Sequence, residues 1–203
     1  MLQTAVPRIL LIAAIPLTIH LLLVLDKPLW AALLILALPG LAGIGLIRRG
    51  SVLGGLLLLL SIASMSLVLV LDAPLLPLYL PPILINAALA LLFGLSLLPG
   101  STALIVRFAT RMADDITPGM ARYAYWLTAA WALVFAGLSV ESWLLAHYAT
   151  LQTWSLFINL LNYLFVVLVF VVEYPIRRWV LGKLPHDGFV DFISQLSRQR
   201  FPG

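Results

Sequence analysis

The sequence has no cysteine and few charged residues. Without cysteine the chain forms no disulfide bond, no thiolate metal site and no cysteine nucleophile. Charged residues make up 10% of the chain, whereas they make up about a quarter of an average soluble domain. The 12 Lys and Arg and 8 Asp and Glu cannot cover the water-exposed surface of a 203-residue soluble fold. A hydrophobic content of 63% also excludes a disordered chain.

The sequence contains long hydrophobic runs, and its mean hydropathy is +1.11. A membrane-spanning helix needs about 20 mostly apolar residues, because the hydrocarbon core is roughly 30 Å thick. The first run lacks a cleavage site, which predicts a retained span rather than a signal peptide. The predicted fold class is all-α integral membrane, with one transmembrane domain over residues 1–203 and no strands. Six segments meet the length requirement: residues 9–25, 29–47, 52–71, 78–98, 123–145 and 154–172.

The basic residues predict the orientation of this six-helix bundle. If the N-terminus lies in the cytoplasm, 11 Lys and Arg lie on the cytoplasmic side and only Lys27 lies on the other. This is the bias described by the positive-inside rule. We therefore expect a multi-pass membrane protein with both termini in the cytoplasm.

A short motif occurs twice, 46 residues apart. The sequence VLDKPL at residues 24–29 returns as VLDAPL at residues 70–75, each time between two predicted spans. The repeat indicates two tandem helical hairpins. Convergence explains it equally well, because Asp ends a helix at the interface and Pro starts the next helix in its first turn.

Two further segments are amphipathic but too short to span a membrane. Apolar residues recur at helical spacing over residues 101–115 and 187–198, with basic residues on the opposite face. This pattern predicts interfacial helices on an anionic leaflet, or surface helices that pack on the bundle.

Polar residues in the last predicted span suggest a binding site. Glu173 and Arg177 have the i,i+4 spacing of a helical ion pair, which either anchors the helix end or, with Arg178, binds an anionic headgroup. Asn159 and Tyr163 continue the same helical stripe, and Asn159, Asn162 and Asn86 are predicted to form hydrogen bonds between helices. The candidate ligand- or partner-binding residues are Arg107, Arg111, Asn159, Tyr163, Glu173, Arg177 and Arg178.

A second group of polar residues lies toward the predicted outer side. The candidate cluster consists of His20, Asp26, Asp72 and Glu141. It would relay protons or bind a cation; alternatively, Glu141 reaches water and His20 forms a hydrogen bond within the bundle. No H-E-x-x-H or similar metal-binding spacing is present, so we expect no metal site, no cofactor and no zinc protease activity.

The second half of the chain resembles a family of small bacterial inner-membrane proteins associated with gene clusters for aryl-polyene and fatty-acid-type biosynthesis. The resemblance rests on Arg107-Phe108-Ala109, on Tyr123 with residues 127–132, on residues 154–159 with Tyr163, and on residues 173–178. It implies a location in the bacterial inner membrane and an accessory role in making or moving a lipid-linked acyl product. It implies no catalytic residue.

Three classes of function fit these observations. The preferred one is a non-catalytic membrane protein that binds a partner or a lipid or acyl amphiphile at its cytoplasmic face. The alternatives are a small transporter or flippase subunit for a lipid-like molecule, and an integral-membrane enzyme that modifies lipids. The expected partners are membrane lipids, anionic headgroups and other membrane or acyl-synthesis proteins, but not nucleic acid.

Overall fold

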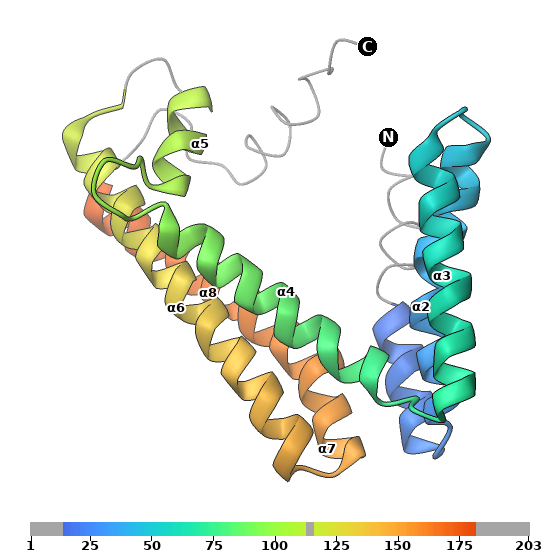
Figure 1. Cartoon of the computed structure of the whole chain (residues 1–203). Coiled ribbons are helices and arrows are strands. Elements are labelled where there is room, and N and C mark those ends of the chain that lie inside the picture. The colour runs from blue at the N-terminus through green and yellow to red at the C-terminus, as the bar shows by residue number, and fades with distance from the viewer. Residues whose placement is uncertain (1–13, 113–115, 182–203) are drawn as a thin grey trace, which may run out of the picture.

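The computed structural model describes residues 14–112 and 116–181, and these residues form helices joined by short connections (Figure 1). No strand occurs among them, as the predicted all-α fold class requires. The helices are, in chain order, a first helix over Ala14–Val24, α2 (Pro28–Ile47), α3 (Val52–Leu71), α4 (Leu76–Leu95), α5 (Leu104–Met112), α6 (Pro118–Tyr148), α7 (Leu151–Leu156), the π-helical turn η1 (Phe157–Leu161) and α8 (Asn162–Leu181).

Within the described residues, five helices are long and apolar enough to cross a membrane. They are α2, α3, α4, α6 and the continuous helix Leu151–Leu181 that α7, η1 and α8 form together. The prediction of six spans is confirmed only for these five. The other predicted span, residues 9–25, is helical over Ala14–Val24, and its beginning lies outside the described residues.

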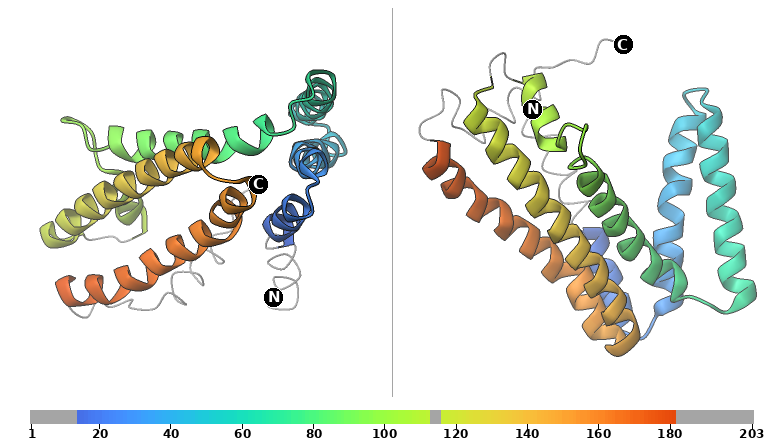
Figure 2. Two further views of the ribbon diagram at one scale, coloured as in Figure 1. Left: turned by 90° about the horizontal axis from the view of Figure 1, so that it is seen from below. Right: turned by 60° about the vertical axis from the view of Figure 1, so that its left-hand side comes forward.

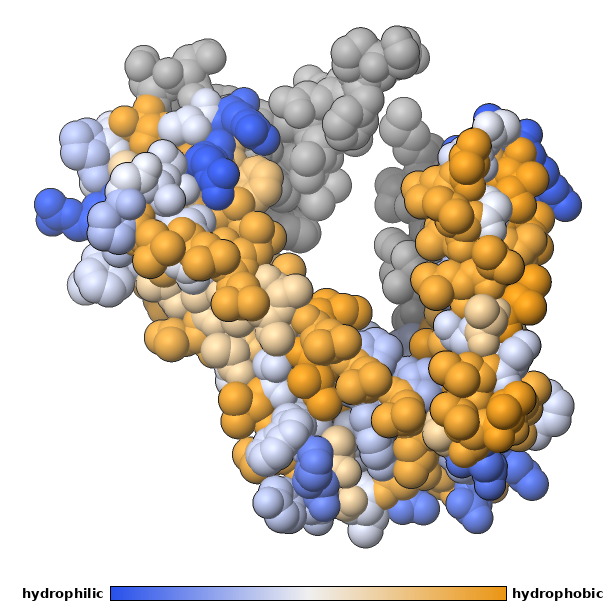
Figure 3. Space-filling view, viewed as in Figure 1, coloured by the Kyte–Doolittle hydropathy of each residue, from blue (hydrophilic) through white to orange (hydrophobic). Residues whose placement is uncertain are grey.

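The helices form two arms that meet at one end (Figures 1 and 2). The α2–α3 hairpin is one arm; in the other, α6 lies between α4 and α8. At the junction, the first helix and the adjoining ends of α2, α4 and α7 bury a small core of Ile19, Leu23, Ala31, Ala32, Leu78 and Trp154. Most other apolar side chains face outward (Figure 3), as expected of helices surrounded by lipid.

Small residues allow α2 and α3 to approach closely. A Cβ atom added to Gly43 would lie 2.6 Å from the carbonyl oxygen of Gly54, and one added to Gly54 would lie 2.6 Å from that of Gly43. Farther along, the hydroxyl of Ser61 donates a hydrogen bond to the carbonyl of Leu36. Pro39 lies in the same part of α2 and has no N–H to donate to the carbonyl of Ile35, the residue before Leu36.

Backbone carbonyls also join α4 to α6. The Ser139 hydroxyl of α6 donates a 2.9 Å hydrogen bond to the carbonyl of Ile83, directly after Pro81 and Pro82 in α4. The Asn86 side chain instead donates to the carbonyl of Pro82 in its own helix. The expected interhelical role of Asn86 is therefore wrong: the carbonyl one turn earlier accepts its N–H.

The repeated motif ends a helix in the same way in both copies. Asp26 and Asp72 adopt left-handed backbone conformations, with φ angles of 56° and 48°. A short polar side chain tolerates this conformation better than most. Pro28 is the first residue of α2, as expected, whereas α4 begins at Leu76 with Pro77 in its first turn, after Pro74. The two copies thus share the helix end but not the helix start.

Helix α5 confirms the predicted helix in residues 101–115 only over Leu104–Met112; residues 101–103 precede the helix, and residues 113–115 lie outside the described residues. Its first backbone N–H groups donate to side chains of neighbouring helices: Leu104 to the Ser96 hydroxyl at 3.0 Å and Ile105 to the Thr128 hydroxyl at 3.2 Å. These contacts hold α5 at the end of the α4–α6 pair and leave Arg107 and Arg111 exposed. The second predicted interfacial helix, residues 187–198, lies outside the described residues.

Candidate functional site

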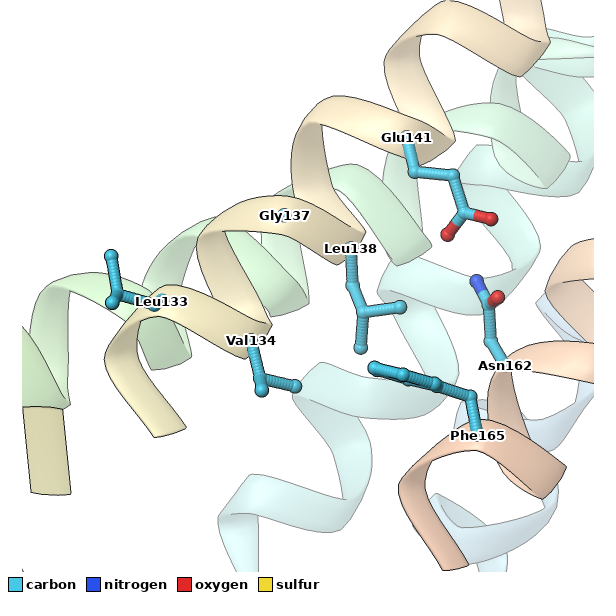
Figure 4. Close-up of a pocket in the computed structure, with 7 residues that line it drawn as sticks. All are labelled: Leu133, Val134, Gly137, Leu138, Glu141, Asn162 and Phe165. Carbon is cyan, nitrogen blue, oxygen red and sulfur yellow. The ribbon is translucent and has the colours of Figure 1, made fainter. Parts of the chain in front are cut away.

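A pocket of about 440 Å³ lies between α6 and α8 (Figure 4). We call it the α6–α8 pocket. Its walls are apolar except for Glu141 of α6 and Asn162 of α8, which point toward one another. The lining residues are Leu133, Val134, Gly137, Leu138, Glu141, Asn162 and Phe165. Pockets that hold small molecules typically measure about 300–1,000 Å³ and combine apolar walls with a few polar groups.

Contacts on both sides of the pocket fix the distance between α6 and α8. Toward one end, the side chains of Asn162 and Glu141 face one another (Figure 4). Toward the other end, the rings of Trp131 and Phe170 lie 4.7 Å apart, and the Tyr123 hydroxyl donates a 2.8 Å hydrogen bond to Glu173. Between these contacts Gly137 contributes no side chain, so the pocket stays open.

The pocket is accessible from the side of the molecule. Leu133 is 75% exposed and Phe165 is 44% exposed, and both belong to the apolar surface that would face lipid. A molecule dissolved in the bilayer therefore reaches Glu141 without crossing the protein.

A smaller cavity of about 200 Å³ lies where the first helix, α2, α4 and the π-helical turn meet. We call it the Trp154 cavity. The residues that line it are Ile15, Pro16, Ile19, Ile35, Leu78, Pro81, Pro82, Ile85, Trp154, Ile158, Asn159 and Tyr163. Trp154 is 2% exposed, and its ring meets that of Tyr79 edge-on at 4.9 Å.

Beside this cavity, a hydrogen-bonded group joins the first helix to α7. Nδ2 of Asn159 donates to the carbonyl and to the hydroxyl oxygen of Ser155, at 3.1 Å in each case. Nδ1 of His20 lies 2.9 Å from the same hydroxyl. Because this hydroxyl already accepts from Asn159, donation from Ser155 to His20 uses all these groups at once. Asn159 thus bonds within its own helix, which corrects its predicted interhelical role.

The pairing of Ser155 with His20 resembles a nucleophile and its base, but the surroundings indicate a structural role. Ser155 has 0% exposure and lies in the middle of a helix. A nucleophile must reach its substrate within hydrogen-bonding distance. The contact therefore fastens the first helix to α7.

The predicted ion pair of Glu173 and Arg177 is present, with Nε of Arg177 3.7 Å from Oε1 of Glu173. Tyr123 is the second partner of Glu173, and the Arg177 guanidinium lies 5.7 Å from the centre of the Tyr174 ring. These contacts favour the predicted anchoring role of the pair over a headgroup pocket. Arg178 is exposed nearby, and Asn159 and Tyr163 lie in the Trp154 cavity, away from this group.

The predicted outer cluster is divided among separate surroundings. Asp26 and Asp72 lie exposed in two different turns. His20 contacts Ser155, and Glu141 contacts Asn162 in the α6–α8 pocket. No group of three or more His, Asp and Glu side chains that could hold a metal ion occurs in the part of the chain that the structure describes.

Sequence reasoning missed Gly137, Trp154 and Ser155 as site residues. Gly137 is the only glycine in the predicted span 123–145, and this position indicated a helix face without a side chain. Trp154 and Ser155 gave no comparable signal, because their surroundings come from residues more than 60 positions away.

Five long apolar helices, most of whose surface is itself apolar, define a multi-pass helical membrane protein. Comparison with protein-family models, with curated protein sequences and with solved structures finds no match. The resemblance to proteins of aryl-polyene and fatty-acid-type gene clusters therefore stays a prediction.

Proposed function

We propose that the protein is a non-catalytic membrane component that binds a lipid or acyl amphiphile in the α6–α8 pocket. The observation that carries this proposal is the combination of an apolar, laterally open pocket with one carboxyl group in its wall. The hydrocarbon chain would lie against Leu133, Val134 and Phe165, and the polar group would lie at Glu141 and Asn162. Glu141 lies toward the predicted outer side, so this site differs from the cytoplasmic face that the sequence favoured for binding.

The lining residues indicate the chemistry of the polar group. A carboxylate offers only acceptors, and none of the residues that line the pocket is basic. An unpaired charge within a membrane is costly, and a bound donor lowers that cost. A headgroup that donates hydrogen bonds, above all an amine, therefore fits better than a carboxylate or a phosphate.

The basic residues support the predicted attachment to an anionic leaflet. Arg48 and Arg49 between α2 and α3 lie at the same end of the molecule as α5 with Arg107 and Arg111 (Figure 1). Each basic residue near an anionic membrane surface contributes about 1 kcal/mol to the attraction. We propose that this end faces the cytoplasm.

The cavity walls favour binding over the two alternative functions. A transporter needs a polar path through the membrane, whereas both cavities are lined mainly by apolar side chains. An enzyme needs a nucleophile or an acid–base pair that reaches its substrate. Ser155 is wholly buried, and Glu141 has no second acid, base or nucleophile among the residues that line its pocket.

Blocking the pocket tests the proposal. A Cβ added to Gly137 meets no atom within 4 Å, so Gly137→Phe places a ring in the pocket without a clash on the backbone. A long-chain amine with a dansyl group at the far end serves as the probe, because dansyl fluorescence rises in an apolar site. We expect saturable binding to the wild-type protein and at least roughly tenfold weaker binding to Gly137→Phe, a difference of about 1.4 kcal/mol.

Gly55→Phe is the matched control, because Gly55 also has open space around its Cβ position but lies on α3, away from the pocket. This variant should bind the amine as the wild type does. Equal binding by all three proteins would show that the probe binds elsewhere, and would contradict the proposal.

A further inference from the structure

The indole N–H of Trp154 is a buried donor in need of an acceptor. Its Nε1 atom is inaccessible to solvent and has no hydrogen-bond partner among the described residues. Buried polar groups in native proteins are nearly always paired, and an exception calls for an explanation such as a bound molecule. Trp154 lines the cavity named after it, so a molecule in that cavity would lie against this side chain.

The two prolines of α4 that line the cavity leave backbone carbonyls without their helical donors. Pro81 and Pro82 of α4 both line the cavity and have no N–H group to donate. The carbonyl groups four residues earlier, those of Pro77 and Leu78, therefore lack their usual helical donors. Leu78 itself lines the cavity and is 1% exposed.

The rest of the cavity is uncharged and mainly apolar. None of the residues that line it carries a charge, and five of them are isoleucines. A charged headgroup would lie there without a counter-ion, at a high cost in free energy. The group that suits these walls is neutral, accepts one hydrogen bond and donates another, and a hydroxyl does both.

The local helix geometry also sets this place apart. The π-helical turn Phe157–Leu161 carries Ile158 and Asn159 into the cavity wall. Such turns are rare and occur frequently at functional sites. Asn159 is 8% exposed and held by Ser155, so its side chain is fixed before any ligand arrives.

We propose that the Trp154 cavity is a second binding site, which holds the hydroxyl end of a single-chain lipid alcohol. The hydroxyl oxygen accepts from Nε1 of Trp154, and its hydrogen is donated to a carbonyl that Pro81 or Pro82 leaves without a helical donor. At about 200 Å³ the cavity is smaller than most small-molecule sites, so it holds the head and the first carbons while the chain continues between the helices. The proposal does not depend on the α6–α8 pocket.

Quenching of tryptophan fluorescence tests whether a lipid alcohol binds in the Trp154 cavity, because bromine quenches tryptophan fluorescence on contact. The purified protein in phosphatidylcholine nanodiscs is titrated with hexadecanol brominated beside the hydroxyl-bearing carbon, and with hexadecane brominated at the matching carbon. We expect the alcohol to quench one of the six tryptophans saturably, and the alkane to quench without saturation. Trp154→Phe should lose the saturable part, whereas Trp143→Phe, at an exposed position of α6, should keep it.

A second variant keeps Trp154 in place. Replacing Pro81 and Pro82 by Ala restores N–H donors to the two carbonyls, which should weaken binding of the alcohol roughly threefold to tenfold, the loss of about one hydrogen bond. If Trp154→Phe fails to fold, the proline variant alone tests the proposal. The proposal is overturned if the alkane saturates like the alcohol, if Trp154→Phe retains the saturable part, or if the proline variant binds the alcohol unchanged, as expected when only water occupies the cavity.

Discussion

The two glutamates of the last two long helices have contrasting surroundings. Glu173 accepts a hydrogen bond from Tyr123 and pairs with Arg177, so its charge is compensated within the protein. Glu141 has the amide of Asn162 as its neighbour and faces the α6–α8 pocket (Figure 4). At the scale of single residues, Glu173 therefore contributes to stability and Glu141 is available to a ligand.

Replacing Glu141 by Gln tests this distinction. Gln keeps the size of the side chain and removes the charge, so binding of the dansyl amine should weaken and its advantage over the matching dansyl carboxylic acid should disappear. The measurement is a fluorescence titration of each probe with the wild type and with Glu141→Gln. Unchanged preference for the amine would contradict the assigned role of Glu141.

Glu173→Gln is the matched comparison and should behave in the opposite way. It weakens the contact with Arg177 and the charge-assisted hydrogen bond from Tyr123, which should cost about 1 kcal/mol of folding free energy. Thermal unfolding in detergent measures this loss, and binding of the amine should stay as in the wild type.

The sequence predicted one part of this network and missed another. The i,i+4 spacing of Glu173 and Arg177 fixes their distance within one helix, so the ion pair could be predicted. The contact of Glu173 with Tyr123 joins residues 50 positions apart, and only the packing of α6 on α8 creates it. The sequence alone left two roles open for Glu173 and Arg177, an anchoring ion pair and a headgroup site, and the contact with Tyr123 favours the first.

At the scale of helices, α2 and α3 depend on the absence of side chains at their crossing. Gly43→Ala and Gly54→Ala each place a Cβ 2.6 Å from a backbone oxygen, so the helices must move apart. We expect each change to destabilise the protein by about 1–3 kcal/mol, the usual cost of overpacking. The measurement is the free energy or temperature of unfolding in detergent.

Gly45→Ala and Gly55→Ala are matched controls in the same two helices, because a Cβ at either position meets nothing within 4 Å. These variants should be as stable as the wild type or slightly more stable, since Ala favours helix over Gly. Equal destabilisation by all four changes would show that the glycines matter for some reason other than close packing.

The helices differ in how far sequence could predict them. Hydropathy placed α2 and α3 within one residue of their observed limits, because uniformly apolar runs between polar turns leave little freedom. It predicted α6 too short, since the helix begins at Pro118, capped by the Thr117 hydroxyl, before the apolar run starts. The π-helical turn over Phe157–Leu161 has no sequence signal, because a run of apolar residues and one Asn fits an α-helix equally well.

At the scale of the whole molecule, the distribution of charge predicts the orientation, and the absence of cysteine makes it simple to test. Single cysteines at Ser51 and Ser101 should be protected from a membrane-impermeant maleimide in intact cells, whereas cysteines at Ala73 and Ala149 should react. A cysteine at Thr4 tests the number of spans. With six spans, Thr4 lies on the same side of the membrane as Ser51, so we expect Thr4→Cys to be protected as Ser51→Cys is. Reaction of Thr4→Cys together with Ala73→Cys would indicate five.

The two arms of the molecule are also joined by few contacts beyond the small core around Leu23 and Trp154. The repeated motif does not predict this division. It predicts one hairpin of the first and second spans and another of the third and fourth, whereas α2 pairs with α3 and α4 packs on α6 in the other arm. The sequence does not predict the angle between the arms either. That angle depends on contacts at the junction, such as the hydrogen bond of His20 with Ser155, between residues 135 positions apart.

The most direct test of the central proposal is to locate a bound amphiphile on the intact protein. A long-chain amine with a photoreactive diazirine in its chain is added to the protein in nanodiscs, irradiated, and mapped by mass spectrometry of the resulting peptides. We predict that the label concentrates on Leu133, Val134, Leu138 and Phe165, and that Gly137→Phe removes it. Labels spread evenly over the exposed faces of α3 and α4, unchanged by Gly137→Phe, would contradict a binding site between α6 and α8.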